Sequence, residues 1–242
     1  MSSLKYSEVV RLSSSGGERF SAFQARHHSF GGLMSPVLGF DHFRLTADVF
    51  GPHRHAGMSA ISYVFEDSVP YHNQDSIGTD LTIDPGSLLW TWAGSGVVHH
   101  EVGTVEGGEV HGLQLFLDIA PANRSLPPKS VFIPREKMPA ISEDGISVRV
   151  VMGSTSTTVN PVTTPEPVTL LDITLGAGKS YIHPLPAGFN GTVYLLEGAV
   201  EIGNAALRPN EAISFGAAGT NEPVTVTASA DSRLLLISGP PS

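Results

Sequence analysis

The chain has 242 residues, of which 40% are hydrophobic, and a formal net charge of −9. This length fits one large β domain or two smaller ones, and the apolar content supports a sizeable core, which excludes a largely disordered chain. The negative charge and the lack of a basic tract argue against direct nucleic-acid binding. The absence of cysteine excludes disulfides, thiolate metal ligands and cysteine nucleophiles.

The N-terminal segment, residues 1–20, is polar and rich in Ser and Gly. It lacks the apolar core of a signal peptide. No apolar run reaches the roughly 20 residues that a transmembrane helix needs. We therefore expect a cytoplasmic globular protein with no membrane association.

The apolar segments are short and β-rich, and 26 Gly and 18 Pro residues imply many turns between them. No long segment has helical periodicity. Short strands separated by turn signals are typical of a sandwich or barrel, so the predicted fold class is all-β. The clearest predicted strands are residues 60–65, 113–117, 168–173 and 234–237.

The chain order indicates two halves. Early strands in residues 6–23 are joined by a flexible Ser/Gly stretch at 13–17, and further strands follow up to Ile119. Residues 120–139 are rich in proline with little alternation, which predicts a linker or crossover. We accordingly expect an N-terminal domain over residues 1–122 and a C-terminal domain over residues 123–242.

Two histidine clusters in the first half predict a metal site. His53 and His55 are two residues apart, so on a β-strand both imidazoles leave the same face. His99 and Glu101 repeat this spacing. If the two strands lie side by side, three imidazoles and a carboxylate converge, a donor set that suits a divalent transition metal better than Ca²⁺ or Mg²⁺.

The second half is a weak internal repeat of the first. Residues 194–197 repeat the order Tyr, two apolar residues and Glu found at 63–66, and residues 207–211 parallel 82–86. The second copy has only His183 where the first has His53 and His55, and it has no His-x-Glu pair near residues 217–222. We expect the second half to lack metal ligands.

Taken together, these motifs resemble those of the pirins, a two-domain family of the cupin superfamily. The resemblance covers nearly the whole chain and depends on four motifs in order: His-x-His at 53–55, Ala-Gly-x-Gly at 93–96, His-x-Glu at 99–101 and His-Gly-Leu-Gln at 111–114. It implies two tandem cupin-type (jelly-roll) β-barrels. It also implies metal ligation in the first barrel, and the family pattern places the ligands at His53, His55, His99 and Glu101.

The resemblance further implies a function. Several pirins are quercetin 2,3-dioxygenases, so we expect O2-dependent ring opening of a flavonol, with Glu101 as the catalytic base. Iron(II) is the metal expected on family grounds, and Mn, Co, Ni, Cu or Zn would also suit the ligands. The expected partners are a small planar aromatic or enol substrate and O2. Some eukaryotic pirins act as nuclear transcriptional cofactors, so a protein partner is a further expectation.

Three alternatives remain open at this point. The chain could be a metal-containing regulatory protein whose metal redox state alters a surface read by a partner. It could catalyse another metal-dependent reaction on a small enol or keto acid. It could also be a structural relic without metal. Two departures from the family pattern bear on the substrate: Ala56 stands where pirins commonly carry a basic residue, and Ser59 stands where they carry Glu.

We expect structural or surface roles for the remaining histidines and for two glutamates of the second half. His100 should point away from His99, and His111 is expected to hydrogen-bond in the core. Glu197 and Glu201 are expected to be solvated. Five apolar residues could either pack in the core or line the pocket, and the sequence does not distinguish the two: Met58, Phe65, Leu88, Trp90 and Trp92. The histidines expected on the surface or in loops are His27, His28, His42 and His72.

Overall fold

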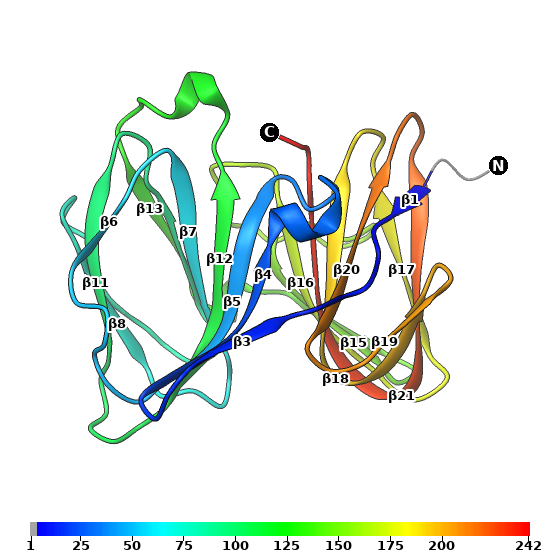
Figure 1. Ribbon diagram of the computed structural model, residues 1–242, viewed down its shortest axis with the longest axis horizontal. Helices are drawn as coiled ribbons and strands as arrows, with labels where there is room; N and C mark the ends of the chain where they lie inside the picture. The colour runs from blue at the N-terminus through cyan, green and yellow to red at the C-terminus, as the bar shows by residue number, and fades with distance from the viewer. Residues whose placement is uncertain (1–3) are drawn as a thin grey trace. The chain divides into compact units, whose positions relative to one another are not determined.

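The computed structural model describes residues 4–242 and shows a protein made almost wholly of β-strands (Figure 1). Residues 1–3 lie outside the described residues. They are the first residues of the predicted N-terminal domain and of the polar N-terminal segment. The all-β prediction is confirmed, because residues 4–242 contain only three short 3-10 helices beside the strands. None of these helices is long and apolar enough to span a bilayer.

The chain forms two compact β units. The first, called here the N-barrel, comprises residues 13–25 and 37–136, with Ser242. The second, called the C-barrel, comprises the chain up to Leu12 together with residues 26–36 and 137–241. The expectation of two tandem barrels is therefore confirmed.

Two sheets form the described part of the N-barrel. A seven-stranded sheet runs in the order β13-β10-β7-β12-β5-β4-β3, and a four-stranded sheet runs β6-β11-β8-β9. The strands are β3 (Ser13–Gly16), β4 (Phe20–Arg26), β5 (Val37–Leu45), β6 (His53–His55), β7 (Met58–Val64), β8 (Tyr71–Asp75), β9 (Asp80–Ile83), β10 (Leu88–Trp92), β11 (Val97–Gly103), β12 (Val110–Asp118) and β13 (Lys129–Ile133).

Two of the predicted apolar strands, residues 60–65 and 113–117, correspond to β7 and β12, which are interior strands of the seven-stranded sheet. Every residue of β10 is buried, and so are six of the seven residues of β7, the strand beside it. Continuous burial of this kind occurs where both faces of a strand are covered. The segment predicted to be a linker contributes β13, which pairs with β10 from Leu88↔Ile133 to Trp92↔Lys129.

Among residues 4–242, the C-barrel consists of one ten-stranded sheet that closes around a hydrophobic core. Leu171, Val193 and Leu234 are among its core residues. The strands are β1 (Leu4–Tyr6), β2 (Val10–Arg11), β14 (Ala140–Glu143), β15 (Ile146–Met152), β16 (Thr169–Leu175), β17 (Ser180–Leu185), β18 (Asn190–Ile202), β19 (Ala205–Leu207), β20 (Glu211–Ala217) and β21 (Glu222–Gly239).

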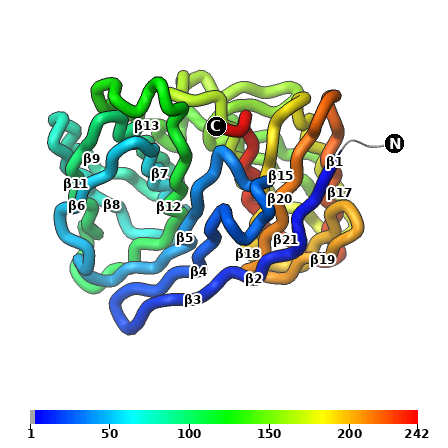
Figure 2. Tube along the Cα trace, turned by 45° about the horizontal axis from the view of Figure 1, so that its top comes forward, coloured from blue at the N-terminus to red at the C-terminus, as the bar shows by residue number. Residues whose placement is uncertain are grey.

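The N-terminal segment contributes strands to both units. β1 and β2 pair with β20, far away in the sequence, before the chain continues into β3 (Figure 2). The segment after β4 contains the 3-10 helix η1 (His27–Phe30), whose Phe30 is buried. The other two 3-10 helices are η2 (Pro121–Asn123) and η3 (Arg135–Lys137).

Candidate metal centre

The two histidine motifs lie on adjacent strands of the N-barrel. β6 and β11 are antiparallel, and their register places His53 opposite His99 and His55 opposite Val97. Side chains of the same parity on paired strands leave the same face of the sheet. Ring nitrogens of His53, His55 and His99 all lie within 4.8 Å of one another. The convergence expected from the spacing is therefore present for the three imidazoles.

The Gly-rich motif before β11 positions this strand pair. Arg54, between the two histidines, donates from Nη2 to the carbonyl oxygen of Ser95 at 2.9 Å. Its guanidinium passes so close to Gly96 that a Cβ there would lie 2.3 Å from Nη2. Gly96 also has φ of +140°, which L side chains rarely adopt. Glycine is thus required at this position for Arg54 to anchor β6 to the turn.

Hydrogen bonds hold two of the three imidazoles by their Nδ1 atoms. His53 Nδ1 lies 3.0 Å from the carbonyl oxygen of Gly51, and His99 Nδ1 lies 3.1 Å from Asn73 Oδ1. Both partners are acceptors, so each Nδ1 carries the hydrogen and each Nε2 keeps its lone pair. Asn73 is fully buried on β8, opposite Glu101, and therefore forms a fixed part of the site.

The two Nε2 lone pairs face one another. His53 Nε2 and His99 Nε2 are 3.1 Å apart. Two lone pairs at this distance repel unless a cation lies between them. A histidine whose other nitrogen donates to an oxygen is the usual arrangement of a metal ligand. The donor set therefore fits a single divalent transition metal.

Burial keeps two of these imidazoles neutral, the form that binds a metal. It lowers the pKa of His99 to about 3, with smaller contributions from His55 and His53. It also lowers the pKa of His55 to about 4, helped by His53. Both rings carry a free lone pair at neutral pH.

Glu101 lies beside the cluster but outside the set of converging nitrogens. Its Oε2 is 4.0 Å from His99 Nδ1, and its Oε1 accepts a hydrogen bond from Ser62 Oγ at 2.6 Å. Burial raises the pKa of Glu101 to about 7, although the Ser62 hydrogen bond opposes this shift. Ser62 Oγ also lies 3.0 Å from the amide oxygen Oε1 of Gln114, a second acceptor. A hydroxyl has one hydrogen, and Glu101 Oε1 is the nearer of the two acceptors.

A cavity of about 120 Å³ opens next to His53, His55 and Glu101. Its other lining residues are mostly aromatic and come from β4, β5, β8, β12 and the loop before β6. Phe20 and Phe50 meet edge to face, with ring centroids 4.9 Å apart. The remaining lining residues are Asp41, Phe43, Tyr71, Gln114 and Phe116.

None of the five residues left open between core packing and pocket lining lines the cavity. Phe65, Leu88, Trp90 and Trp92 are buried in the core, and Met58 is half-buried. The sequence patterns indicated no role for Ser62 and Asn73, which brace the site, or for seven of the residues that line the cavity: Phe20, Asp41, Phe43, Phe50, Tyr71, Gln114 and Phe116. One signal was present, because Ser62 and Gln114 are polar residues inside otherwise apolar strands.

Ser59, which replaces the family's usual Glu, is fully buried on β7. Its Oγ has no hydrogen-bond partner among residues 4–242. The expectation for His100 is supported, because its Nε2 contacts Asp48 Oδ2 at 2.8 Å and its side chain is partly exposed. Glu197 and Glu201 are exposed, as expected.

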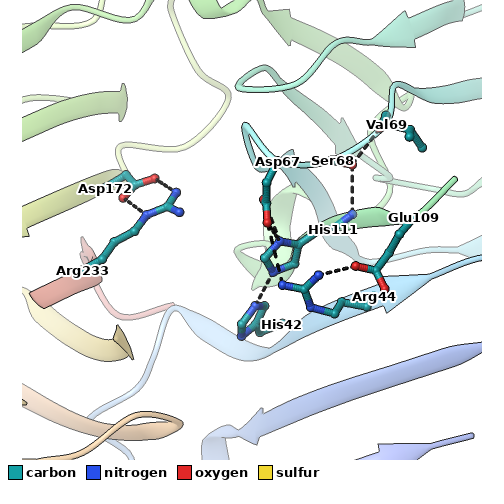
Figure 3. A network of polar contacts seen from close by, with 9 residues as sticks. All are labelled: His42, Arg44, Asp67, Ser68, Val69, Glu109, His111, Asp172 and Arg233. Atoms are coloured by element: carbon teal, nitrogen blue, oxygen red, sulfur yellow. Dashed lines mark hydrogen bonds and ion pairs between the residues drawn. The ribbon is translucent and has the colours of Figure 1, made fainter. Parts of the chain in front are cut away.

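His111 belongs to a second polar network of the N-barrel (Figure 3). Its Nδ1 lies 2.7 and 2.8 Å from the two carboxylate oxygens of Asp67, which is also 3.8 Å from Arg44 Nη2. Arg44 pairs in turn with Glu109. These contacts support the core hydrogen-bonding role expected for His111.

The interpretation of His42 as a surface or loop residue is wrong. His42 is half-buried on β5, and its Nε2 lies 2.8 Å from His111 Nε2. β5 pairs with β12, and this pairing brings the two rings together. His72 lies on β8, not in a loop, and contacts Asp80 and Thr82. His27 and His28 are exposed in η1.

Comparisons with known proteins identify relatives over most of the chain. The Pirin family model matches residues 13–117, and the model for the pirin C-terminal cupin domain matches residues 170–242. Pirin from Rattus norvegicus is 32% identical over 203 residues, which cover 81% of this chain and 69% of the rat protein.

Solved structures support the same fold. The structure of GK1651 from Geobacillus kaustophilus has a TM-score of 0.88 and 27% identity, covering 98% of this chain and 96% of that one. Quercetin 2,3-dioxygenase from Acinetobacter baumannii has a TM-score of 0.86 and 24% identity, covering 98% of this chain and 87% of that one.

Proposed function

Because this chain belongs to the pirin family, we propose that it is a metal-dependent dioxygenase that opens the ring of a flavonol such as quercetin. The observation that carries the proposal is the pair of facing Nε2 atoms of His53 and His99, 3.1 Å apart beside an aromatic cavity. The proposed ligands are His53, His55, His99 and Glu101. Iron(II) is the proposed metal.

A divalent transition metal held by these residues would supply Lewis acidity toward a hydroxyl oxygen and redox chemistry toward O2. The chain itself supplies the base. Glu101 lies at the cavity wall and takes the proton of the flavonol 3-hydroxyl. Ser62 donates to Glu101 Oε1, so the Glu101 carboxylate is held in one orientation while the proton is transferred.

The aromatic side chains orient the substrate and exclude water. Phe43, Phe116 and Tyr71 offer flat apolar surfaces to a planar ring. The volume of about 120 Å³ is below the roughly 300 Å³ typical of pockets for drug-sized ligands. We infer that one ring of the flavonol enters the cavity, while the rest of the molecule contacts Phe50, whose side chain is 55% exposed.

The reaction consumes one O2 for each flavonol, places both oxygen atoms in the products and releases one carbon as carbon monoxide. The test is to load the protein with iron(II) without oxygen, add quercetin and O2, and measure carbon monoxide against quercetin lost. Equal amounts support the proposal. The matched control is a flavone without the 3-hydroxyl, which offers Glu101 no proton and should release none.

The competing regulatory interpretation makes a different prediction in the same experiment. If the metal serves only to change a surface of this protein that a partner recognises, the protein would bind metal but release no carbon monoxide. Turnover of another enol with no turnover of quercetin would instead retain the metal chemistry and change the substrate.

A further inference from the structure

The C-barrel contains a larger cavity than the N-barrel. Its volume is about 520 Å³, and it lies between the loop of residues 153–168 and the strands β16, β17 and β21. All its lining residues belong to the C-barrel. The volume falls within the roughly 300–1,000 Å³ that is typical of small-molecule sites.

The lining of this cavity combines apolar faces with uncharged hydrogen-bonding groups. None of the residues that line it is Asp, Glu, Lys or Arg. Three proline rings and Phe189 offer apolar faces. The groups that can hydrogen-bond belong mostly to the loop and to β16: Ser154, Thr155, Asn160, Thr163, Thr164 and Thr169.

One buried imidazole in this lining has an unused nitrogen. His183 on β17 is 2% exposed, and its Nε2 lies 2.9 Å from Ser238 Oγ. Its Nδ1 has no hydrogen-bond partner anywhere in the described chain. Leaving such an atom unpaired costs free energy, about 1–3 kcal/mol in general. Burial lowers the pKa of His183 to about 4, so the ring is neutral at physiological pH.

The surroundings of His183 do not form a transition-metal site like the one in the N-barrel. The residue opposite His183 across the strand pair is Val224, whereas His53 faces His99. A single imidazole among hydroxyls does not make a transition-metal site. With no charged side chain in the lining, neither an anion nor a cation would find a counter-charge.

The wall formed by the loop is held in place by its own hydrogen bonds. Asn160, which is 5% exposed, donates from Nδ2 to the carbonyl oxygens of Val150 and Val151, both at 3.0 Å. Its Oδ1 accepts from the backbone N–H of Val162 at 2.9 Å. A bridge joins Ser154 and Val159. The cavity is therefore preformed and can bind a ligand without first ordering the loop.

From this geometry we propose that the C-barrel binds an uncharged, hydroxyl-bearing ring compound, held by a hydrogen bond to His183 and by contacts with the proline rings and Phe189. The site is independent of the metal centre. A ring compound fits because its faces can pack on Phe189 and the prolines, while its hydroxyls replace water at the threonines.

The experiment titrates the full-length protein, labelled with ¹⁵N at histidine, with resorcinol, an uncharged diphenol whose meta hydroxyls do not chelate a metal. The side-chain nitrogen signals of His183 should shift with saturation, whereas those of His53, His55 and His99 should not. Benzoate and benzylammonium have similar rings with a charge, and neither should shift the His183 signals.

Two variants at different positions are tested, so that misfolding of one variant does not decide the outcome. His183→Phe keeps a flat ring but removes the hydrogen bond, and we expect about tenfold weaker binding by calorimetry. Val159→Trp fills the cavity from a position that is 70% exposed, so it should block binding without disturbing the core. The matched control is Ile182→Trp, which adds the same side chain on the outer face of β17, where Ile182 is 58% exposed.

Loss of resorcinol binding in His183→Phe and Val159→Trp, with binding retained in Ile182→Trp, would support the proposal. Three results would overturn it. The first is that His183 signals stay unchanged at saturating resorcinol. The second is that benzoate shifts them equally. The third is that binding survives Val159→Trp but is lost in His53→Ala, which would place the compound in the N-barrel.

Discussion

Asn73 Oδ1 accepts a hydrogen bond from His99 Nδ1 at 3.1 Å, and this contact turns His99 Nε2 toward His53. Removing the acceptor would free the ring to rotate and to change its tautomer. We predict that Asn73→Ala lowers metal affinity about 10- to 100-fold, as such second partners of ligating histidines usually do. Metal competition titration would measure this change.

The matched control for Asn73 is Gln74→Ala, on the next position of β8, where the side chain is exposed and contacts Asp80. This variant should bind metal like the parent protein. Equal affinity in the Asn73 variant and the parent would contradict the role given to the Asn73–His99 hydrogen bond.

The second prediction concerns the base. Glu101→Gln removes the proton acceptor but keeps the shape of the side chain and leaves the three imidazoles in place. Turnover of quercetin should fall by about 10²- to 10⁴-fold, while most of the metal stays bound, because the three imidazole ligands remain and the Gln amide oxygen can still coordinate. Steady-state oxygen uptake with parallel elemental analysis checks this. Loss of metal together with activity would show that Glu101 acts mainly as a ligand.

The third prediction concerns substrate contact outside the cavity. Phe50→Ala removes an exposed ring that packs edge to face on Phe20, so KM for quercetin should rise about 3- to 10-fold with kcat little changed. Val49→Ala alters the neighbouring exposed side chain, which does not line the cavity, and serves as the control. An unchanged KM in Phe50→Ala would place the second ring of the flavonol elsewhere.

The fourth prediction concerns pH and the C-barrel. The pKa of His183 is about 4 in the folded protein, below the ordinary value of 6.5, because burial disfavours the imidazolium. Well above pH 6.5 the ring is neutral in both the folded and the unfolded state and contributes no pH dependence. As pH falls from 6.5 to 4 the unfolded state takes up the proton first, so folding stability is lost by about 3 kcal/mol.

His183→Phe removes this titration. The difference in unfolding free energy between the variant and the parent, measured in urea at pH 7.5 and pH 4.5, should move in favour of the variant on acidification. A difference that stays constant between the two pH values would show that His183 titrates normally in the folded protein.

The fifth prediction concerns the second polar network. Asp67→Ala leaves His111 Nδ1, a buried donor, without its carboxylate partner and should cost about 1 kcal/mol of stability. Metal content should not change, because the network does not contact the ligands. Glu106→Ala, at an exposed position of the turn before β12, is the control for loss of a surface charge. Denaturant unfolding followed by fluorescence would measure both.

The metal motif could be predicted from sequence because it is local. The spacing of His53 and His55, repeated by His99 and Glu101, follows directly from the two-residue period of a strand. The family motifs then indicated which strands would be neighbours. The structure adds the distances and the orientation of each ring.

The residues that brace the site could not be predicted in this way. Asn73 contacts His99 only because β8 pairs with β11, and Ser62 reaches Glu101 from another sheet. His42 was misjudged for the same reason, since its contact with His111 depends on the register of β5 with β12. Such registers join segments that are far apart in sequence, so local patterns do not specify them.

The most direct test of the account measures bound metal and quercetin-dependent oxygen uptake on the same iron-loaded sample. The account predicts about one metal ion per chain, as expected for one mononuclear site, and uptake that rises in proportion to bound metal and is absent in His99→Ala. A fully loaded protein that consumes no oxygen with quercetin would contradict the proposed dioxygenase activity.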